Sequence, residues 1–254
     1  MSVPSASSKL PDVGTTIFTV MTAMANKYGA HNLAQGFPEF EPDPWLRDRV
    51  KYYIDNGYNQ YAPMMGIAPI REAIAEKLQD YYNYRVNPLS EVTVTSGATE
   101  AIFVAIQSVV KPGDEVIIFD PAYDSYDPAV RLAGGKAVHL PLTEESFAID
   151  WQLLSDSINS RTRLVIINSP HNPTGAILRD GDLERLADLL ENTDCLLLSD
   201  EVYEHIIFEN EAHASVLKNQ RLAERSFVVS SFGKTYHMTG WKIGYCVAPA
   251  KLST

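Results

Sequence analysis

RLVIIN at residues 163–168 and CLLLS at 195–199 are short apolar runs rich in branched side chains. Such runs are typical of strands that are buried on both faces, as in parallel sheets. Five more runs of this kind occur in the chain: VTVT (92–95), EVIIF (115–119), KAVHL (136–140), SFVVSS (226–231) and KIGYCV (242–247). Because helical segments separate most of them, the sequence predicts an α/β three-layer sandwich with a seven-stranded, mostly parallel sheet.

The segments outside these runs are mostly helical in pattern. Apolar side chains recur at three- and four-residue spacing in residues 15–27, 69–82, 98–110 and 181–191. The gap between the last two runs, at 232–241, is short for a helical crossover. The last strand is therefore predicted to pair antiparallel.

Composition and charge exclude several classes of protein. The 254 residues include 21 Lys and Arg against 32 Asp and Glu, a net charge of −11, so nucleic-acid binding is not expected. The two cysteines, Cys195 and Cys246, lie in apolar runs, which excludes a disulfide scaffold and favours a reducing compartment. No apolar stretch reaches membrane-spanning length, and residues 1–12 lack the features of a secretory signal. We expect a cytoplasmic protein.

Polar, aromatic, Gly and Pro residues follow the predicted strands. In open α/β sheets, ligands bind beyond the carboxyl ends of the strands. The segments at these positions are SGATEA (96–101), DPAYDSY (120–126), NSPHNPTG (168–175), DEVYEH (200–205) and FGKTYHMTGWK (232–242). Their clustering predicts a ligand site at this end of the sheet.

Charged side chains directly after two buried strands are candidates for chemistry. Lys234 follows SFVVSS closely, where a poorly solvated amine can become a nucleophile that forms a Schiff base. The alternative is a lysine that reaches the surface. Asp200 follows four apolar residues, and its carboxylate is either the counter-ion of a buried cation or a helix N-cap.

Two uncharged segments could add binding groups. The amides of Ser96 to Thr99 begin a predicted helix and suit a phosphate, although an ordinary cap has the same pattern. NSPHNPTG forms a rigid turn that could direct Asn172 inward, or a plain surface loop.

Other motif interpretations find little support in the sequence. Glu201, Glu204 and His205 have no second ligand pair at matching spacing, so no metal site is predicted. Ser231 and Lys234 form S-x-x-K, but the S-D-N and K-T-G motifs of penicillin-binding proteins do not follow. Motifs for nicotinamide binding, the P-loop and α/β-hydrolases are also missing from the sequence.

Taken in order, the strand-exit motifs resemble the fold-type I, pyridoxal-phosphate-dependent aminotransferases of class I/II. The resemblance extends from about residue 10 to the end and includes NLAQGFP (32–38) and NQYAPMMG (59–66). It is greatest to the methionine aminotransferases and the kynurenine (glutamine-type) aminotransferases, and SFGKTYHMTGWK (231–242) is especially close to the methionine group.

This resemblance implies pyridoxal 5′-phosphate (PLP) as cofactor and assigns roles around its ring. Lys234 matches the lysine that holds PLP as an aldimine and later moves the substrate proton. Asp200 matches the acid that pairs with the pyridinium nitrogen. Tyr203 and Asn172 match the donors to the ring oxygen, and Tyr123 matches the aromatic side chain stacked on the ring.

The resemblance also implies phosphate and substrate contacts. The residues matched to the phosphate site are Gly97, Ala98, Thr99, Ser231 and Lys242. Tyr61 is expected to come from the other subunit, because the site of this family forms at the interface of a homodimer. Gly36, Asn172 and, more weakly, Phe18 match substrate contacts.

The implied activity is transfer of an amino group from an L-amino acid (methionine, aromatic or glutamine-like) to a 2-oxo acid. Two alternatives stay open: a PLP-dependent cysteine-conjugate β-lyase, and a PLP-binding fragment without turnover. Family members continue into a C-terminal small domain that carries the arginine for the substrate carboxylate, and this domain is expected to be missing here. The predicted division is an N-terminal arm and small-domain segment at 1–43 and a large PLP-binding domain at 44–254.

Overall fold

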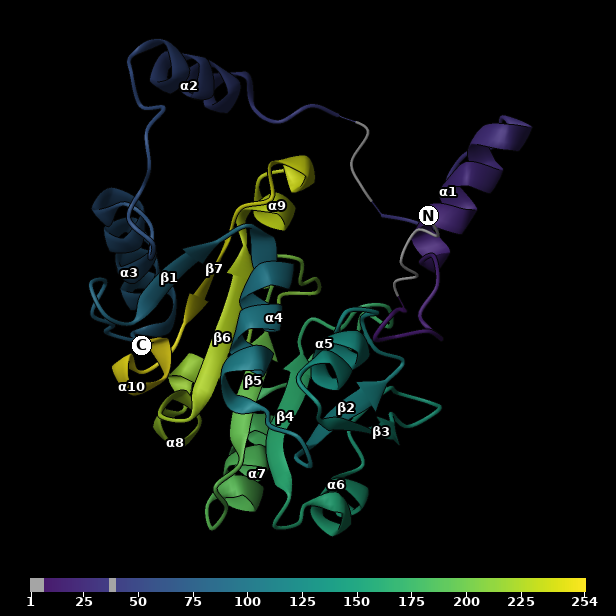
Figure 1. Ribbon diagram of the computed structural model, residues 1–254. Helices are drawn as coiled ribbons and strands as arrows, with labels where there is room; N and C mark the ends of the chain where they lie inside the picture. The colour runs from purple at the N-terminus through teal and green to yellow at the C-terminus, as the bar shows by residue number, and fades with distance from the viewer. Residues whose placement is uncertain (1–6, 37–39) are drawn as a thin grey trace, which may run out of the picture.

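A single seven-stranded sheet dominates the computed structural model, which describes residues 7–36 and 40–254 (Figure 1). The strand order is β1-β7-β6-β5-β4-β2-β3. Strand β7 is antiparallel to both of its neighbours, and the other pairs are parallel. The strands are β1 (Val92–Thr95), β2 (Glu115–Asp120), β3 (Lys136–Pro141), β4 (Thr162–Asn168), β5 (Leu196–Asp200), β6 (Ser226–Ser231) and β7 (Gly244–Val247). The predicted mostly parallel α/β sheet and its antiparallel last strand are confirmed.

Helices occupy most of the connections. The α-helices are α1 (Ile17–Tyr28), α2 (Pro44–Asp55), α3 (Ala68–Tyr82), α4 (Gly97–Val109), α5 (Tyr126–Leu132), α6 (Trp151–Ser157), α7 (Asp180–Leu190), α8 (Gln220–Ala223), α9 (Phe232–Thr235) and α10 (Ala250–Ser253). Short 3-10 helices are η1 (Val216–Lys218) and η2 (Thr239–Trp241). Helices α1, α3, α4 and α7 match the predicted helices, with ends within two residues of those expected.

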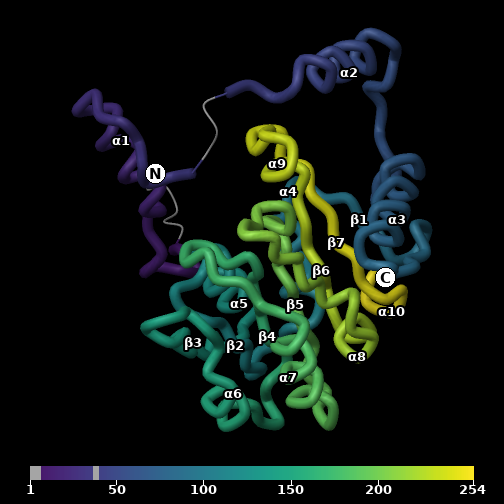
Figure 2. The backbone as a smooth tube through the Cα atoms, turned by 180° about the vertical axis from the view of Figure 1, so that it is seen from behind, coloured from purple at the N-terminus to yellow at the C-terminus, as the bar shows by residue number. Residues whose placement is uncertain are grey.

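The helices form two layers that enclose the sheet. Helices α4 and α5 cover the face seen in Figure 1, where Ile106 and Val130 pack against Ile118. Helices α3, α6, α7 and α8 cover the opposite face, which is turned to the viewer in Figure 2, and Leu186 packs there with Leu197. Because both faces are covered, residues 164–167 of β4 and residues 197–198 of β5 are apolar and buried.

Strand β7 is shorter than the predicted run at 242–247. It begins at Gly244, because Lys242 has a left-handed backbone with φ 54° and turns the chain before the strand starts. The predicted run at 195–199 is also displaced by one residue, since β5 covers Leu196–Asp200. Asp200 is therefore itself the last residue of a strand.

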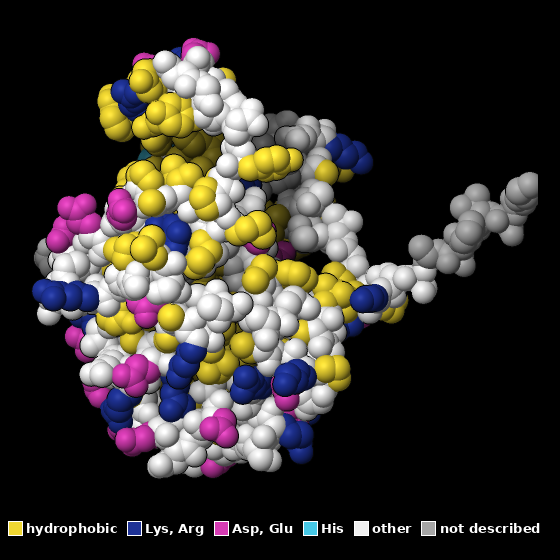
Figure 3. Space-filling model, turned by 60° about the vertical axis from the view of Figure 1, so that its left-hand side comes forward, with side chains coloured by type: hydrophobic (Ala, Val, Ile, Leu, Met, Phe, Trp, Pro, Cys, Tyr) yellow, Lys and Arg dark blue, Asp and Glu magenta, His cyan; other side chains and the backbone are white. Residues whose placement is uncertain are grey.

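Helices α1 and α2 stand apart from the sheet, as Figures 1 and 2 both show, and neither buries a residue. Large apolar side chains gather over α2 in Figure 3, and those exposed on this helix include Trp45, Tyr53 and Ile54. The division at residue 43 stays a prediction, and residues 1–6 and 37–39 of the predicted arm lie outside the described part. In that part no helix is long and apolar enough to cross a membrane.

Candidate active site

Asp200 ends β5 at the carboxyl edge of the sheet and is almost completely buried, with 4% of its surface exposed. Its Oδ2 accepts a hydrogen bond of 2.6 Å from the hydroxyl of Tyr126, and its Oδ1 accepts one of 3.3 Å from the amide of Val202. Burial raises the pKa of Asp200 to about 6, although these two hydrogen bonds and the charge of Lys234 act in the opposite direction. Turns follow Asp200 instead of a helix, so it is not a helix N-cap.

Lys234 lies on α9, directly after β6, and is half-buried. Its Nζ is 5.3 Å from the centre of the Tyr203 ring. Ser231 caps this short helix, because its Oγ accepts a hydrogen bond of 3.1 Å from the amide of Gly233. The exits of β5 and β6 thus bring the predicted amine, phenol and carboxylate together.

The start of α4 forms a concave backbone surface beside Lys242. Gly97 has φ 78°, and a Cβ on this residue would lie 3.3 Å from Cε and 3.4 Å from Nζ of Lys242. A Cβ on Gly244 would lie 2.6 Å from both the Gly97 carbonyl carbon and the Ala98 amide nitrogen. Glycine at both positions lets the start of β7 and the Lys242 side chain approach the start of α4 closely, which places an ammonium group beside the amides of a helix N-terminus. These groups fit the phosphate of PLP.

Tyr123 lies between this concave surface and Asp200. Its hydroxyl is 3.4 Å from Oγ1 of Thr99, near the start of α4. Its ring makes an edge contact with Tyr126 at a centroid distance of 5.6 Å. Tyr123 therefore links the candidate phosphate site with the residue that binds Asp200.

Two residues that the sequence interpretation missed hold the site together. Tyr126 ends the DPAYDSY motif, and only the structure shows its bond to Asp200. Asn168 donates from Nδ2 to the backbone oxygen of Asp200 at 2.8 Å, and its Oδ1 accepts a hydrogen bond of 2.7 Å from the amide of Asn172. Asn168 thus fixes the loop that carries Asn172 against the end of β5. Both residues belong to motifs already identified at strand exits, and this position is the only feature of the sequence that could have indicated their role.

Three predicted site residues lie away from this cluster. Tyr61 is fully exposed, Gly36 is exposed, and Phe18 is half-buried on α1. No contact that the structure gives for these three residues joins them to Lys234 or Asp200. Their assigned roles stay predictions that depend on a second subunit or on a bound substrate.

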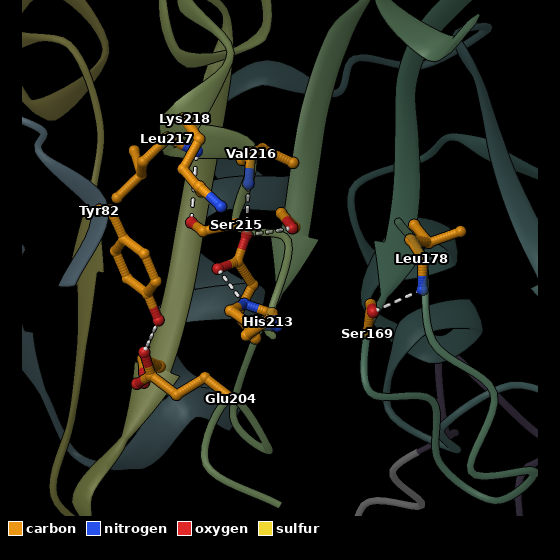
Figure 4. Close-up of polar contacts among 12 residues, drawn as sticks. Tyr82, Ser169, Leu178, Glu204, His213, Ser215, Val216, Leu217 and Lys218 are labelled. Atoms are coloured by element: carbon orange, nitrogen blue, oxygen red, sulfur yellow. Dashed lines mark hydrogen bonds and ion pairs between the residues drawn. The ribbon is translucent and has the colours of Figure 1, made fainter. Parts of the chain in front are cut away.

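The carboxylates considered as metal ligands have other partners. Glu201 accepts hydrogen bonds from Ser199 and from the amide of Val216 and pairs with His213 at 2.8 Å. Two of these partners, His213 and Val216, are labelled in Figure 4. Glu204 pairs with Lys77 at 2.5 Å. Within residues 7–36 and 40–254, no group of three His, Cys, Asp or Glu side chains is arranged to hold a metal ion.

Two cavities flank the NSPHNPTG loop. One, of about 450 Å³, is lined by Asn172 and Tyr203 together with Ile206 and Phe208. The other, of about 480 Å³, has Tyr126 and Asn168 among its lining residues, and neither cavity is lined by Lys234 or Asp200. The first cavity is therefore the one that adjoins the predicted donors to the cofactor ring.

Comparison with known proteins agrees with this arrangement. Residues 29–254 match the family model "Aminotransferase class I and II". The chain is 51% identical to methionine aminotransferase of Escherichia coli over 246 residues, which cover 97% of this chain and 64% of that protein. It is 32% identical to a kynurenine–oxoglutarate transaminase of Dictyostelium discoideum, over 97% of this chain and 61% of that protein.

Solved structures show the same relationship. An Escherichia coli structure described as having a methionine aminotransferase function superposes with a TM-score of 0.94 at 49% identity, over 100% of this chain and 65% of that one. N-succinyldiaminopimelate aminotransferase from Mycobacterium tuberculosis superposes with a TM-score of 0.94 at 41% identity, over 98% of this chain and 65% of that one. The chain thus spans slightly less than two thirds of the length of these relatives. It belongs to the class I and II aminotransferase family.

Proposed function

We propose that this chain provides the PLP-binding site of an aminotransferase that moves an amino group from an L-amino acid to a 2-oxo acid. One observation carries the proposal: in a chain of this family, the Lys234 amine lies over the Tyr203 ring beside the buried Asp200 carboxylate. When bound, PLP would supply the electron sink that stabilises negative charge at the amino acid α-carbon.

The amine of Lys234 would bind the cofactor covalently and, once the substrate amine had displaced it, would move a proton at the substrate α-carbon. Its position at a strand exit would hold the amine close to the reacting atoms, as general acid–base catalysis requires. Asp200 would pair with the pyridine nitrogen, and the hydrogen bond from Tyr126 favours the ionised form that this pairing needs.

Neutral side chains and the α4 terminus would orient the cofactor. Tyr203 and Asn172 would donate hydrogen bonds to the ring oxygen, and Tyr123 would stack on the ring. The phosphate would lie against residues that combine backbone amides, a hydroxyl and an ammonium group: Gly97, Ala98, Thr99, Ser231 and Lys242.

Methionine is the first amino donor to test, with aromatic and glutamine-like amino acids next. The high identity to a methionine aminotransferase over nearly the whole chain favours this choice. Gly36 and Phe18 are proposed substrate contacts. We also propose a cytoplasmic location, which the unbridged Cys195 and Cys246 favour.

A homodimer is the proposed assembly. The exposed aromatic side chains of α2, among them Trp45 and Tyr53, would lose water on association. Tyr61 has its whole side chain exposed, so it is accessible to the site of a second subunit.

The proposed chemistry can be tested by trapping the cofactor. The purified chain is incubated with PLP, reduced with borohydride and digested, and the modified peptide is identified by mass spectrometry. We expect pyridoxyl on Lys234 and no adduct at this position in Lys234→Ala. A folded wild-type chain modified only at exposed lysines such as Lys51, as in non-specific labelling, would overturn the proposed site.

Turnover is tested separately, with methionine as donor and a 2-oxo acid as acceptor. Formation of the keto acid of methionine only when acceptor is present supports transamination. A parallel assay uses a cysteine S-conjugate, whose sulfur is on the β-carbon. Release of pyruvate, ammonia and the thiol without acceptor, and no transamination of methionine, would show that β-elimination is the main activity.

A further inference from the structure

Glu204 is a buried carboxylate next to Tyr203 that the proposed chemistry does not use. Only 6% of its surface is exposed. Its Oε1 accepts hydrogen bonds from Nζ of Lys77 at 2.5 Å and from Oγ of Ser230 at 2.6 Å. Its Oε2 accepts one from the hydroxyl of Tyr82, which points directly at the carboxylate in Figure 4.

These donors come from separate parts of the fold. Lys77 and Tyr82 lie on α3, and Ser230 lies on β6, one residue before Ser231. Lys77 also donates to the hydroxyl of Tyr245 on β7 at 2.9 Å. One carboxylate therefore joins the turn after β5 to α3 and to the end of β6.

The charges in this cluster are mutually stabilised. Burial alone would raise the pKa of Glu204, but Lys77, Ser230 and Tyr82 outweigh burial and hold this pKa below its usual value. Burial alone would lower the pKa of Lys77, but Tyr245 and Glu204 raise it above its usual value. Glu204 and Lys77 thus form an ion pair at neutral pH, and a buried ion pair with additional hydrogen bonds fixes the orientation of its groups.

The two strand ends that Glu204 connects are those that carry the proposed cofactor groups. The β5 exit holds Asp200 and Tyr203, and the β6 exit holds Lys234. Tyr203 precedes Glu204 directly, so any movement of the Glu204 backbone also moves the Tyr203 ring relative to the Lys234 amine.

We propose that Glu204 is a positioning residue, whose contacts with Lys77, Tyr82 and Ser230 set the placement of Tyr203 relative to Lys234 and thereby the orientation of bound PLP. This inference rests on the proposed function. Loss of the Glu204 contacts loosens the cofactor ring without removing any group that touches it.

The experiment compares Glu204→Gln with the wild-type chain and with a matched control, Glu115→Gln. Glu115 is also 6% exposed and also pairs with basic residues, Arg161 at 3.0 Å and Lys136 at 3.4 Å. It lies at the first residue of β2, at the end of the sheet opposite to the strand exits. Ser230→Ala is a milder variant that leaves the Glu204–Lys77 pair in place.

Two readouts report on the cofactor itself: the PLP dissociation constant, and the circular dichroism that the protein induces in the absorption band of bound PLP. Glu204→Gln is expected to raise the dissociation constant about five- to tenfold and to weaken the induced signal. Ser230→Ala should change both readouts in the same direction by about two- to threefold. Glu115→Gln should lower the urea midpoint of unfolding and leave both cofactor readouts unchanged.

The possible outcomes separate this inference from the proposed function. If the wild-type chain forms no PLP adduct on Lys234, both are overturned. If the wild-type adduct forms but Glu204→Gln and Ser230→Ala bind PLP with wild-type affinity and signal, the positioning role alone is overturned. An equal change in Glu115→Gln would also overturn it, because a general loss of stability would then explain the effect.

Discussion

The hydroxyl of Tyr126 lies 2.6 Å from Oδ2 of Asp200, and both side chains are buried. Tyr126 is the first residue of α5, whereas Asp200 is the last residue of β5. A carboxylate in such an environment tends to take up a proton, and a hydrogen-bond donor opposes this tendency. The charge of Asp200 therefore depends on a neighbouring phenol as well as on pH.

Replacing Tyr126 by Phe should shift the pH dependence of PLP binding. Burial raises the pKa of Asp200 to about 6, and the Tyr126 hydroxyl lowers it. Loss of this donor should raise the pKa by about one to two further units, because a hydrogen bond to a charged group contributes about 1.5–3 kcal/mol. As the pH is lowered, PLP affinity, followed by absorbance, should then begin to weaken at a pH closer to neutral than in wild type. Tyr81→Phe, at an exposed hydroxyl, is the control, and superimposable profiles for Tyr126→Phe and wild type would refute the prediction.

Replacing Asp200 by Asn should stabilise the PLP-free chain while removing the cofactor pairing. The folded pKa of about 6 lies above the ordinary value of 3.8, so the charged form destabilises the fold. The loss of stability caused by the charged carboxylate is absent below pH 3.8, grows as the pH rises from 3.8 to about 6, and is complete above pH 6. Two pKa units correspond to about 3 kcal/mol. Urea unfolding should show Asp200→Asn to be more stable than wild type at pH 8, with a smaller difference at pH 4; a difference independent of pH would contradict this.

Lys77→Met should strongly destabilise the fold because it leaves the Glu204 carboxylate buried without its cation. Breaking a buried ion pair from one side costs about 3–5 kcal/mol. The matched control is Lys51→Met, since Lys51 and Asp48 form an exposed pair at 2.8 Å whose loss should leave the urea midpoint of unfolding nearly unchanged. Urea denaturation measures both variants. Equal losses in the two variants would show that burial of the Lys77 pair has no energetic consequence.

Gly97→Ala should impair phosphate binding beyond the effect of backbone strain. Gly97 and Gly113 both have positive φ, 78° and 96°, so alanine at either position costs about 1–2 kcal/mol. Only at Gly97 would the new methyl group meet Lys242; at Gly113 it would meet nothing within 4 Å. Gly97→Ala should therefore raise the PLP dissociation constant about tenfold, and Gly113→Ala should leave it unchanged. A similar dissociation constant for both variants would refute a role of this surface in binding.

The strands could be predicted because burial on both faces leaves a local signature. The middle residues of β2, β4 and β5, at 116–119, 164–167 and 197–198, are apolar and buried, which a single run of sequence reveals. The order of the strands leaves no such signature. Strand β7 lies between β1 and β6 because of pairings between distant segments, and Lys242, which has a left-handed backbone, lies next to Gly97, far away in the sequence.

The residues of the candidate site at strand exits were predictable from the sequence. The residues that support them through side-chain contacts were much less so. Lys234, Asp200 and Tyr203 belong to motifs at the carboxyl ends of strands, where ligands bind in such sheets. Tyr126 and Glu204 act through a second side chain, so their significance depends on a partner about 70 and 130 residues away, respectively. No periodicity or spacing in the sequence reports a pairing of that kind.

The placement of β7 also bears on the order in which the molecule can fold. Val92 in β1 pairs with Val247, which is made more than 150 residues later during synthesis. Strand β1 thus gains its neighbour in the sheet only after about 150 further residues have been made, and the start of α4 gains its contact with Gly244 equally late. Contacts this distant in sequence slow folding, because a long loop must close before they form. During translation, the proposed phosphate site would take shape only after β7 has been made.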